Sequence, residues 1–384
     1  MEGGYRIPGL LQPYVNAQTL VVRSPGRINL IGEHTDYNNG FVLPAAIDKA
    51  VYVAVDKTGG AAYRLHSVDF NETVELPAAD IKPVPGHWST YILGVVAQLT
   101  ARGFRVPGFS LTVYGDVPLG AGLSSSAAIE CATAFALNEL LGFGLSLKEL
   151  ALLSQKAEHE YAGVNCGIMD QFASLFGKKG NVIQLDCRSL EYTYFPLELK
   201  EYVILLLDTQ VKHSLASSEY NVRRRQCETG VSLVQEKHPF VTSLRDVTPV
   251  MIEECIPAKD IVYKRCRYVV EENIRLQEGC RDLLGGDLHS FGKKMYATHE
   301  GLSKDYEVSC TELDYLVTSV KSRPEVIGAR MMGGGFGGCT INIVQQESVE
   351  KLLSELTPAY AAAMGRELRH YLVKVENGTS IIYQ

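Results

Sequence analysis

Several features that would identify a membrane, secreted or nucleic-acid-binding protein are missing from this sequence. No stretch of its 384 residues is apolar and long enough to span a bilayer, and residues 1–20 lack the apolar core of a signal peptide. Acidic residues outnumber basic ones by 44 to 37, and the net charge of −7 gives no general attraction for nucleic acids or anionic membranes. We therefore expect a cytoplasmic protein that binds neither nucleic acid nor membrane, and that holds any anionic ligand with local groups.

The sequence also lacks paired cysteines. Its nine cysteines are an odd number and contain no CxxC pair, so we expect reduced and mostly buried thiols. Hydrophobic residues make up 46% of the chain and charged residues 21%, which is typical of an ordinary globular protein. At this length two domains are more common than one.

Strand and helix patterns alternate in the first half of the chain, and long helices dominate the second. The helix predicted at residues 126–141 is apolar on nearly every side, so it must be buried. We place the domain boundary near Leu197, which gives domains of residues 1–197 and 198–384. The clearest predicted elements are strands at 51–56, 109–114 and 202–208 and helices at 126–141, 146–163, 261–284 and 288–302.

A glycine- and serine-rich segment, PLGAGLSSSAA at residues 118–128, lies between the strand at 109–114 and the buried helix. Gly120 and Gly122 let the backbone approach a ligand closely, and the start of the helix offers free amides to an anion. These features favour a phosphate site. The alternative is that the serines only cap the helix and the glycines only form a turn.

Two better-known phosphate-binding motifs do not fit the sequence. The segment at 118–128 lacks the lysine of a P-loop and the third glycine of a dinucleotide fingerprint. A second segment, GGGFGG at residues 333–338, has the spacing of that fingerprint but leads into a predicted strand at 340–344. Since the fingerprint requires a helix at that point, we do not expect a dinucleotide site there.

A polar cluster occurs near the N-terminus in GRINLIGEHTDYNNGFVLP, residues 26–44. Ionised carboxylates accept hydrogen bonds from neighbouring sugar hydroxyls, so the acids suit a polyol ligand. A metal site is less well supported because no second histidine follows at helical spacing, and a serine hydrolase would need a G-x-S-x-G motif. Surface turn charges are a further alternative. The ionisable residues of this cluster are Arg27, Glu33, His34 and Asp36.

Together these segments resemble the motifs of the GHMP kinases, and the EHTDY core is similar to that of the galactokinases. Further matches are NCGIMDQ, HSLASSEYNVRRRQC and GARMMGGGFGGCTINIV, so the resemblance extends over most of the chain. The matched segments are residues 26–44, 118–128, 165–171, 213–227 and 328–344.

The resemblance implies a two-domain α+β fold of the GHMP type. Its N-terminal domain would contain a left-handed β-α-β crossover, which breaks the usual handedness rule, and the active site would lie in the cleft between the domains. The implied reaction transfers the γ-phosphoryl group of MgATP to the C1 hydroxyl of galactose, and we expect a monomer. Alternatives are an N-acetylgalactosamine kinase and a non-catalytic sensor of galactose and ATP, although the Ser-Ser-Ala-Ala run and Asp170 are intact.

The resemblance also assigns roles to individual residues. Arg27 and Asp170 would be catalytic, with Asp170 either a general base or an acceptor that orients the hydroxyl. Ser126 and Glu158 would bind Mg²⁺. The sugar would be bound by Glu33, His34, Thr35, Asp36, Gly167, Asp170 and Tyr220. The ATP would be bound by Gly120, Ala121, Gly122, Leu123, Ser124, Ser125 and Ser126, together with Trp88 and Ser67.

Overall fold

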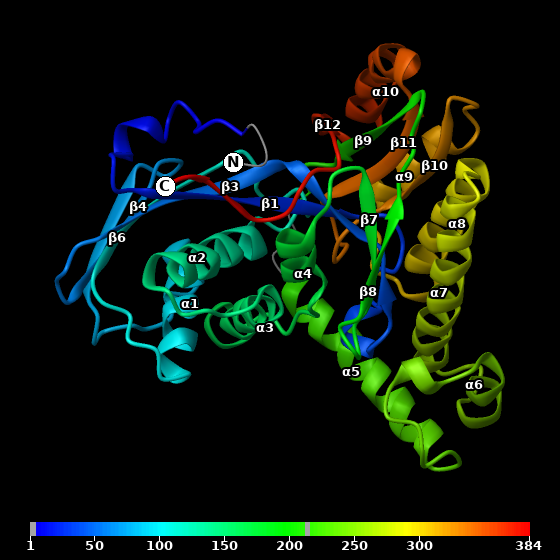
Figure 1. Cartoon of the computed structure of the whole chain (residues 1–384). Helices are drawn as coiled ribbons and strands as arrows, with labels where there is room; N and C mark the ends of the chain where they lie inside the picture. The colour runs from blue at the N-terminus through cyan, green and yellow to red at the C-terminus, as the bar shows by residue number, and fades with distance from the viewer. Residues whose placement is uncertain (1–4, 212–215) are drawn as a thin grey trace.

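A long mixed β-sheet organises the first half of the chain (Figure 1). The structure is a computed structural model and describes residues 5–211 and 216–384. Within the sheet, β1 and β3 run antiparallel, whereas β4 and β6 run parallel. In spatial order the strands are β13 (Ser380–Tyr383), β1 (Leu20–Asn29), β3 (Pro44–Lys57), β6 (Phe109–Gly115), β4 (Ala62–Ser67) and β5 (Glu72–Pro77).

The parallel pair in this sheet requires a crossover connection. Strand β5 forms a hairpin with β4, so helix α1 (Ser89–Ala101) is the element that carries the chain across to β6. This is the connection to which the resemblance assigns a left hand. Trp88 directly precedes α1 and therefore lies at the start of the crossover.

Helices cover one face of the long sheet (Figure 1). α2 and α4 pack against β1 and β3, while α1 and α3 pack against α2. α2 is buried on most sides, and small side chains such as Ala132 and Ala136 let it approach the sheet closely. A capping box of Ser146 and Glu149 begins α3, which ends in a π-helical turn. The bounds are α2 (Ser125–Leu141), α3 (Leu147–Ala157), the π turn η3 (Glu158–Ala162) and α4 (Met169–Phe176).

The second half of the chain combines a smaller antiparallel sheet with long helices. α8 and α9 pack against β10, and α7 packs between α5 and α8. The strands are β10 (Val326–Met331), β11 (Cys339–Gln345), β9 (Tyr202–Asp208) and β12 (Arg369–Val373), in that spatial order. The helices are α5 (Ala216–Gln235), α6 (Pro249–Cys255), α7 (Ile261–Leu284), α8 (Leu288–Glu300), the π turn η5 (Gly301–Asp305), α9 (Thr311–Lys321) and α10 (Val349–Met364).

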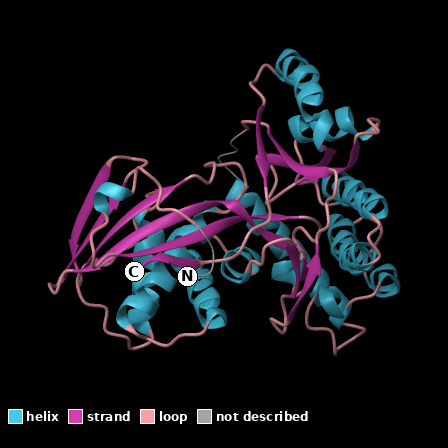
Figure 2. Cartoon of the chain, turned by 45° about the horizontal axis from the view of Figure 1, so that its top comes forward, coloured by secondary structure: helices cyan, strands magenta, loops and turns pink. Residues whose placement is uncertain are grey.

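The two halves of the sequence are interleaved in space. β13, near the C-terminus, pairs with β1, so the C-terminus lies beside the long sheet (Figure 2). A third sheet consists of β2 (Phe41–Val42), β7 (Asn181–Asp186) and β8 (Tyr192–Pro196). It contacts both β3 of the long sheet and helix α7. The predicted strands at 51–56, 109–114 and 202–208 and the predicted long helices are confirmed. The domain boundary near Leu197 stays a prediction. No helix in the described ranges is long and apolar enough for a membrane span.

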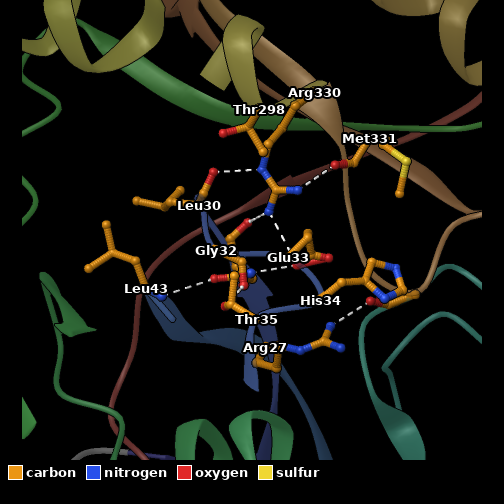
Figure 3. Close-up of polar contacts among 12 residues, drawn as sticks. Arg27, Leu30, Gly32, Glu33, His34, Thr35, Leu43, Thr298, Arg330 and Met331 are labelled. Carbon is orange, nitrogen blue, oxygen red and sulfur yellow. Dashed lines mark hydrogen bonds and ion pairs between the residues drawn. The ribbon is translucent and has the colours of Figure 1, made fainter. Parts of the chain in front are cut away.

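A buried arginine from the second half ties the end of β1 to the start of the glycine motif, residues 328–344 (Figure 3). Arg330, on β10, has no solvent exposure. Its Nε donates to the carbonyl oxygen of Leu30 at 2.6 Å, and its Nη1 donates to that of Met331 at 2.5 Å. Its Nη2 donates to the carbonyl oxygen of Asn29 and lies 3.3 Å from Glu33 Oε1. One guanidinium thus satisfies three main-chain carbonyls and a buried carboxylate.

We predict that Arg330→Met lowers the free energy of unfolding by about 3–5 kcal/mol, because it leaves Glu33 buried without its cationic partner and the carbonyls buried without this donor. Urea unfolding measures the change. Arg323→Met is the matched control, since Arg323 is a partly exposed arginine paired with the exposed Glu355, and a loss of about 1 kcal/mol or less is expected there. Equal losses in the two variants would contradict the anchoring role of Arg330.

Candidate active site

A cavity of about 320 Å³ brings together residues from both halves of the chain. The EHTD loop (residues 31–36) contributes acidic side chains, α4 contributes Asp170, α5 contributes Tyr220, and the glycine motif (residues 328–344) contributes main chain. Most residues to which the resemblance assigns sugar binding therefore line this first cavity. Its lining is Arg27, Glu33, His34, Asp36, Glu158, Val164, Cys166, Gly167, Met169, Asp170, Tyr220, Gly333, Gly334 and Gly335.

One residue with a predicted sugar contact is not in that lining. The hydroxyl of Thr35 is buried and donates to main chain, lying 2.9 Å from the carbonyl oxygen of Gly32 in its own loop and 2.5 Å from that of Phe41 on β2. Its visible role is to shape the loop. A sugar contact of Thr35 stays a prediction. Of the matched segment 213–227, residues 213–215 lie outside the described residues.

Arg27 and Asp170 form a bidentate ion pair in the wall of the first cavity. Arg27 Nε is 2.7 Å from Asp170 Oδ1, and Arg27 Nη2 is 2.7 Å from Asp170 Oδ2. The register of β1 shifts between Pro25 and Arg27, and such an irregularity can re-aim a side chain. Burial is the largest effect and opposes the charge of Arg27, but the attraction and hydrogen bonds of Asp170, together with the negative charges of Glu33 and Asp36, raise its pKa. The arginine therefore stays charged beside the carboxylate.

Asp36, like Glu158, makes no such close ion pair among the described residues. Burial, and then the negative charges of Asp170 and Glu33, raise its pKa to about 7. Gly167 lies directly against it, and a Cβ added at Gly167 would overlap the carboxylate of Asp36. The glycine in NCGIMDQ is thus explained by the space that Asp36 needs.

His34 is held by a directional chain of hydrogen bonds. The carbonyl oxygen of Gly334 can only accept, so His34 Nε2, 3.2 Å away, carries the ring proton. Nδ1 then accepts from the hydroxyl of Tyr37 at 2.8 Å. The Tyr37 oxygen accepts from Tyr306 at 2.7 Å, and Cys227 Sγ donates to the Tyr306 oxygen at 3.2 Å. Both ring nitrogens are engaged by protein, so a sugar contact of His34, which stays a prediction, would use its ring edge or main chain.

The serine loop (residues 118–126) lies beside the first cavity. Gly120 and Gly122 have positive φ angles of 77° and 75°. Ser124, at the N-cap of α2, is left-handed with φ of 58°, and within the described residues its side chain makes no cap to the helix. Its hydroxyl donates instead to Asp170 Oδ2. The capping alternative therefore does not explain Ser124, and the first amides of α2 are available to a ligand.

Ser126, at the end of the serine loop, is hydrogen-bonded to Glu158, which lines the first cavity. Ser126 Oγ donates to Glu158 Oε1 at 3.0 Å, and Glu158 Oε2 accepts from Gln171 Nε2 at 2.6 Å. Burial, followed by the charge of Asp170, raises the pKa of Glu158. Burial and the charge of Glu158 raise the pKa of the fully buried Glu130 well above its usual value. The π turn that begins at Glu158 is a feature often found at functional sites.

A second cavity of about 320 Å³ lies between the long sheet and the N-terminus of α2. It contains two residues that the resemblance assigns to the nucleotide, Ser67 and Trp88, next to Ser125 and Ser126. Sequence reasoning missed other lining residues, notably Phe70 and Leu119, which are 55% and 60% exposed. Exposed apolar side chains at a cavity indicate a ligand surface, but exposure is not visible in the sequence. The missed lining residues also include Val51, Asp69, Gly86, Tyr91, Val113, Gly115, Val117 and Ile129.

Comparisons with known proteins agree with this arrangement. The model of the GHMP kinases N terminal domain matches residues 90–178, and that of the GHMP kinases C terminal matches residues 276–362. The galactokinase galactose-binding signature matches residues 12–57. The fold and these family matches define a GHMP kinase with a mixed α+β architecture.

Individual relatives narrow the assignment. Galactokinases of Thermotoga neapolitana and Roseiflexus sp. are 42% and 39% identical, each over 94% of this chain and over 99% and 92% of their own lengths. A crystal structure of Lactococcus lactis galactokinase complexed with galactose superposes with a TM-score of 0.92 at 32% identity and covers 97% of both chains. The chain belongs to the galactokinase family. A mevalonate kinase at 20% identity and a TM-score of 0.66, covering 93% of this chain and 99% of its own, shares the fold.

We predict that His34 remains neutral, with its proton on Nε2, across the pH range in which the protein is folded. Burial comes first, and the positive charges of Arg223 and Arg330 assist in lowering its pKa to about 3, against the effect of the Gly334 carbonyl. The unfolded chain takes up this proton near pH 6.5, so the contribution of His34 to stability is complete above that pH and is lost as pH falls toward 3.

Nitrogen-15 NMR of histidine-labelled protein checks this prediction. Nδ1 of His34 should show the shift of an unprotonated ring nitrogen and Nε2 that of a protonated one, with no titration around neutral pH. The exposed His289 provides an internal reference. Tyr37→Phe removes the donor to Nδ1 and should move that signal alone. A His34 ring that titrates near neutrality, or that carries its proton on Nδ1, would refute the chain.

Proposed function

We propose that this protein transfers the γ-phosphoryl group of MgATP to the C1 hydroxyl of galactose. The observation that carries the proposal is the position of Asp170. Its carboxylate lines the first cavity beside Glu33 and Asp36, pairs with Arg27, and accepts a hydrogen bond from Ser124 of the serine loop. A hydroxyl bound at Asp170 would therefore face a phosphate held by the serine loop, which is the positioning that phosphoryl transfer requires.

The first cavity suits a sugar because it offers hydrogen-bond acceptors in a confined space. Glu33 is fixed by Asn29 Nδ2 at 2.5 Å and by Arg330, whereas Asp36 has capacity to accept from ligand hydroxyls. Tyr220 lies with its ring centroid 5.2 Å from that of His34 and 5.0 Å from that of Tyr37. This aromatic packing forms an apolar wall against which the C–H face of a sugar can lie. The galactose-binding signature covers the EHTD loop and supports galactose as the sugar.

The second cavity and the serine loop would hold ATP. Trp88, Phe70 and Leu119 present apolar surface for the base, and the amides at the start of α2 face the phosphates. Ser126 and Glu158 fit Mg²⁺, which commonly takes one or two protein oxygens and completes its shell with phosphate and water. No larger cluster of His, Cys, Asp and Glu suited to a metal occurs in the part of the chain described. Mg²⁺ there would neutralise phosphate charge.

Asp170 would accept a hydrogen bond from the C1 hydroxyl of the sugar, and Arg27 would stabilise charge on the transferred group. Transfer forms the bond between the C1 oxygen and the γ-phosphorus, breaks the bond to ADP, and releases the hydroxyl proton toward Asp170. Three donor contacts already hold the Asp170 carboxylate, which fixes its orientation. Whether it acts as base or as orienting acceptor, its removal should weaken catalysis more than binding.

A cytoplasmic location and a monomeric state stay predictions.

ADP release from MgATP tests the function. We expect turnover with galactose and little with glucose, since a wrong C4 configuration leaves a buried carboxylate unpaired. Asp170→Asn should lower turnover by about 100-fold or more while galactose still binds. Turnover mainly with N-acetylgalactosamine would assign the chain to a different sugar, and binding of galactose and ATP without ADP release would make it a sensor. Near-normal turnover of Asp170→Asn would refute its catalytic role.

The pKa of Asp36 predicts a pH dependence of galactose affinity. Its folded pKa of about 7 lies above its usual value, so the carboxylate is ionised only above that pH. The ionised form accepts hydroxyl donors, so the KM for galactose should fall as pH rises through about 7, by at most about tenfold per unit below it. The KM for ATP provides the reference. Asp36→Asn should bind galactose weakly at every pH and lose this dependence; an unchanged profile in that variant would assign the titration to another group.

A further inference from the structure

Glu72 lines neither cavity, but it is hydrogen-bonded to Trp88, which lines the second cavity. Its Oε2 accepts a hydrogen bond from Trp88 Nε1 at 2.8 Å. The two oxygens of Glu72 also lie 3.0 and 3.1 Å from His87 Nε2. One carboxylate on β5 therefore binds two successive side chains that precede α1. These contacts tie the edge of the long sheet to the wall of the second cavity.

The polarity of these contacts requires hydrogen-bond acceptors at position 72, and a carboxylate supplies two oxygens. An indole N–H can only donate, so Glu72 must accept from Trp88. The hydroxyl of the buried Ser89 lies 2.8 Å from His87 Nδ1. When Ser89 donates to that nitrogen, His87 presents its Nε2 proton to Glu72 while remaining neutral. These two donors lower the pKa of Glu72, so it is ionised at neutral pH.

The orientation of Trp88 follows from this arrangement. The indole has one polar atom, and that atom points to Glu72. The His87 ring lies beside it, with centroids 5.5 Å apart and planes tilted by 37°. Trp88 therefore contributes its ring, and not a free N–H group, to the wall of the second cavity. A ring fixed in this way loses less rotamer freedom when a flat ligand stacks on it.

We propose that Glu72 is a positioning residue for the nucleotide base, which acts by holding the Trp88 ring against the second cavity. This inference rests on the proposed function, because it takes the ATP base as the occupant of that cavity. Glu72 itself touches neither the phosphates nor the sugar site. Its removal should therefore weaken nucleotide binding and leave the chemical step and galactose binding unchanged.

Glu72→Ala and Glu72→Gln test the proposal, with Glu75→Ala as the control. Glu75 is on the same strand, exposed, and paired only with the exposed Arg64 across the sheet among the described contacts. Because the interaction is partly exposed, we expect Glu72→Ala to raise the KM for ATP by about three- to tenfold. Glu72→Gln retains one acceptor oxygen and should lie between Ala and the parent. The turnover number and the KM for galactose should change by less than about twofold in all three variants.

Fluorescence gives a readout that a general loss of stability would not produce. Trp88 is the one tryptophan in the sequence, so tryptophan emission reports on this wall alone. Titration with MgADP should change the emission of the parent protein, and the midpoint should rise in Glu72→Ala by the same factor as the KM for ATP. The emission of the free Glu72→Ala protein should also shift, because its indole N–H then meets water; Glu75→Ala should match the parent.

The outcomes separate this inference from the proposed function. If the parent protein phosphorylates galactose and its emission responds to MgADP, but Glu72→Ala binds MgADP as tightly as Glu75→Ala, Glu72 has no positioning role. If the parent is active but its emission does not respond to MgADP, the base lies elsewhere and the inference fails. Absence of galactose phosphorylation by the parent would overturn the proposed function itself.

Discussion

The buried guanidinium of Arg330 is the interaction on which the geometry of the site depends. β1 ends at Asn29, so the carbonyls of Asn29 and Leu30 turn away from the sheet ladder and need other donors. A buried charge is costly to desolvate, and it is tolerated here because each of the three guanidinium nitrogens donates to at least one acceptor. Arg330 is on β10, and its acceptors Asn29 and Leu30 lie at the end of β1. This contact therefore sets the distance between the EHTD loop and the glycine motif.

Other contacts from the second half support the same loop. Glu272 on α7 accepts from the amide of Gly32 at 2.7 Å, and the hydroxyl of Tyr268 donates to the carbonyl oxygen of Glu33 at 3.0 Å. The loop thus belongs to the first half in sequence but is held by the second half in space. A ligand bound by the EHTD loop is therefore positioned relative to both halves of the chain. Arg27 adds a link to the serine loop, because its Nη1 donates to the carbonyl oxygen of Gly122 at 2.6 Å.

The sequence predicted the local parts of this site better than the distant ones. The serine loop could be inferred from residues 118–128 because glycine conformations and a helix N-terminus are properties of one short segment. The roles of Gly167 and Trp88 came from resemblance and stay predictions; the structure shows that Gly167 leaves space for Asp36 and that Trp88 lines the second cavity. The contacts of Arg330 and Glu72 could not be predicted from the sequence. Arg330 is 297 positions from Glu33 and Glu72 is 16 positions from Trp88, and hydrophobic periodicity relates neither pair. The hydrogen-bond chain from Cys227 to His34 likewise exists only after α5 and the EHTD loop have met.

The carboxyl groups of the site divide into those whose charge is already compensated and those whose charge is not. Asp170 has Arg27, and Glu33 has Arg330, whereas burial raises the pKa of both Asp36 and Glu158. The free protein thus keeps two desolvated acids at the positions where the proposed ligands would arrive. Sugar hydroxyls would supply donors to Asp36, and Mg²⁺ would supply positive charge to Glu158. Each ligand would then relieve an electrostatic cost that folding has imposed, so the acids that destabilise the empty site are the ones that favour its occupation.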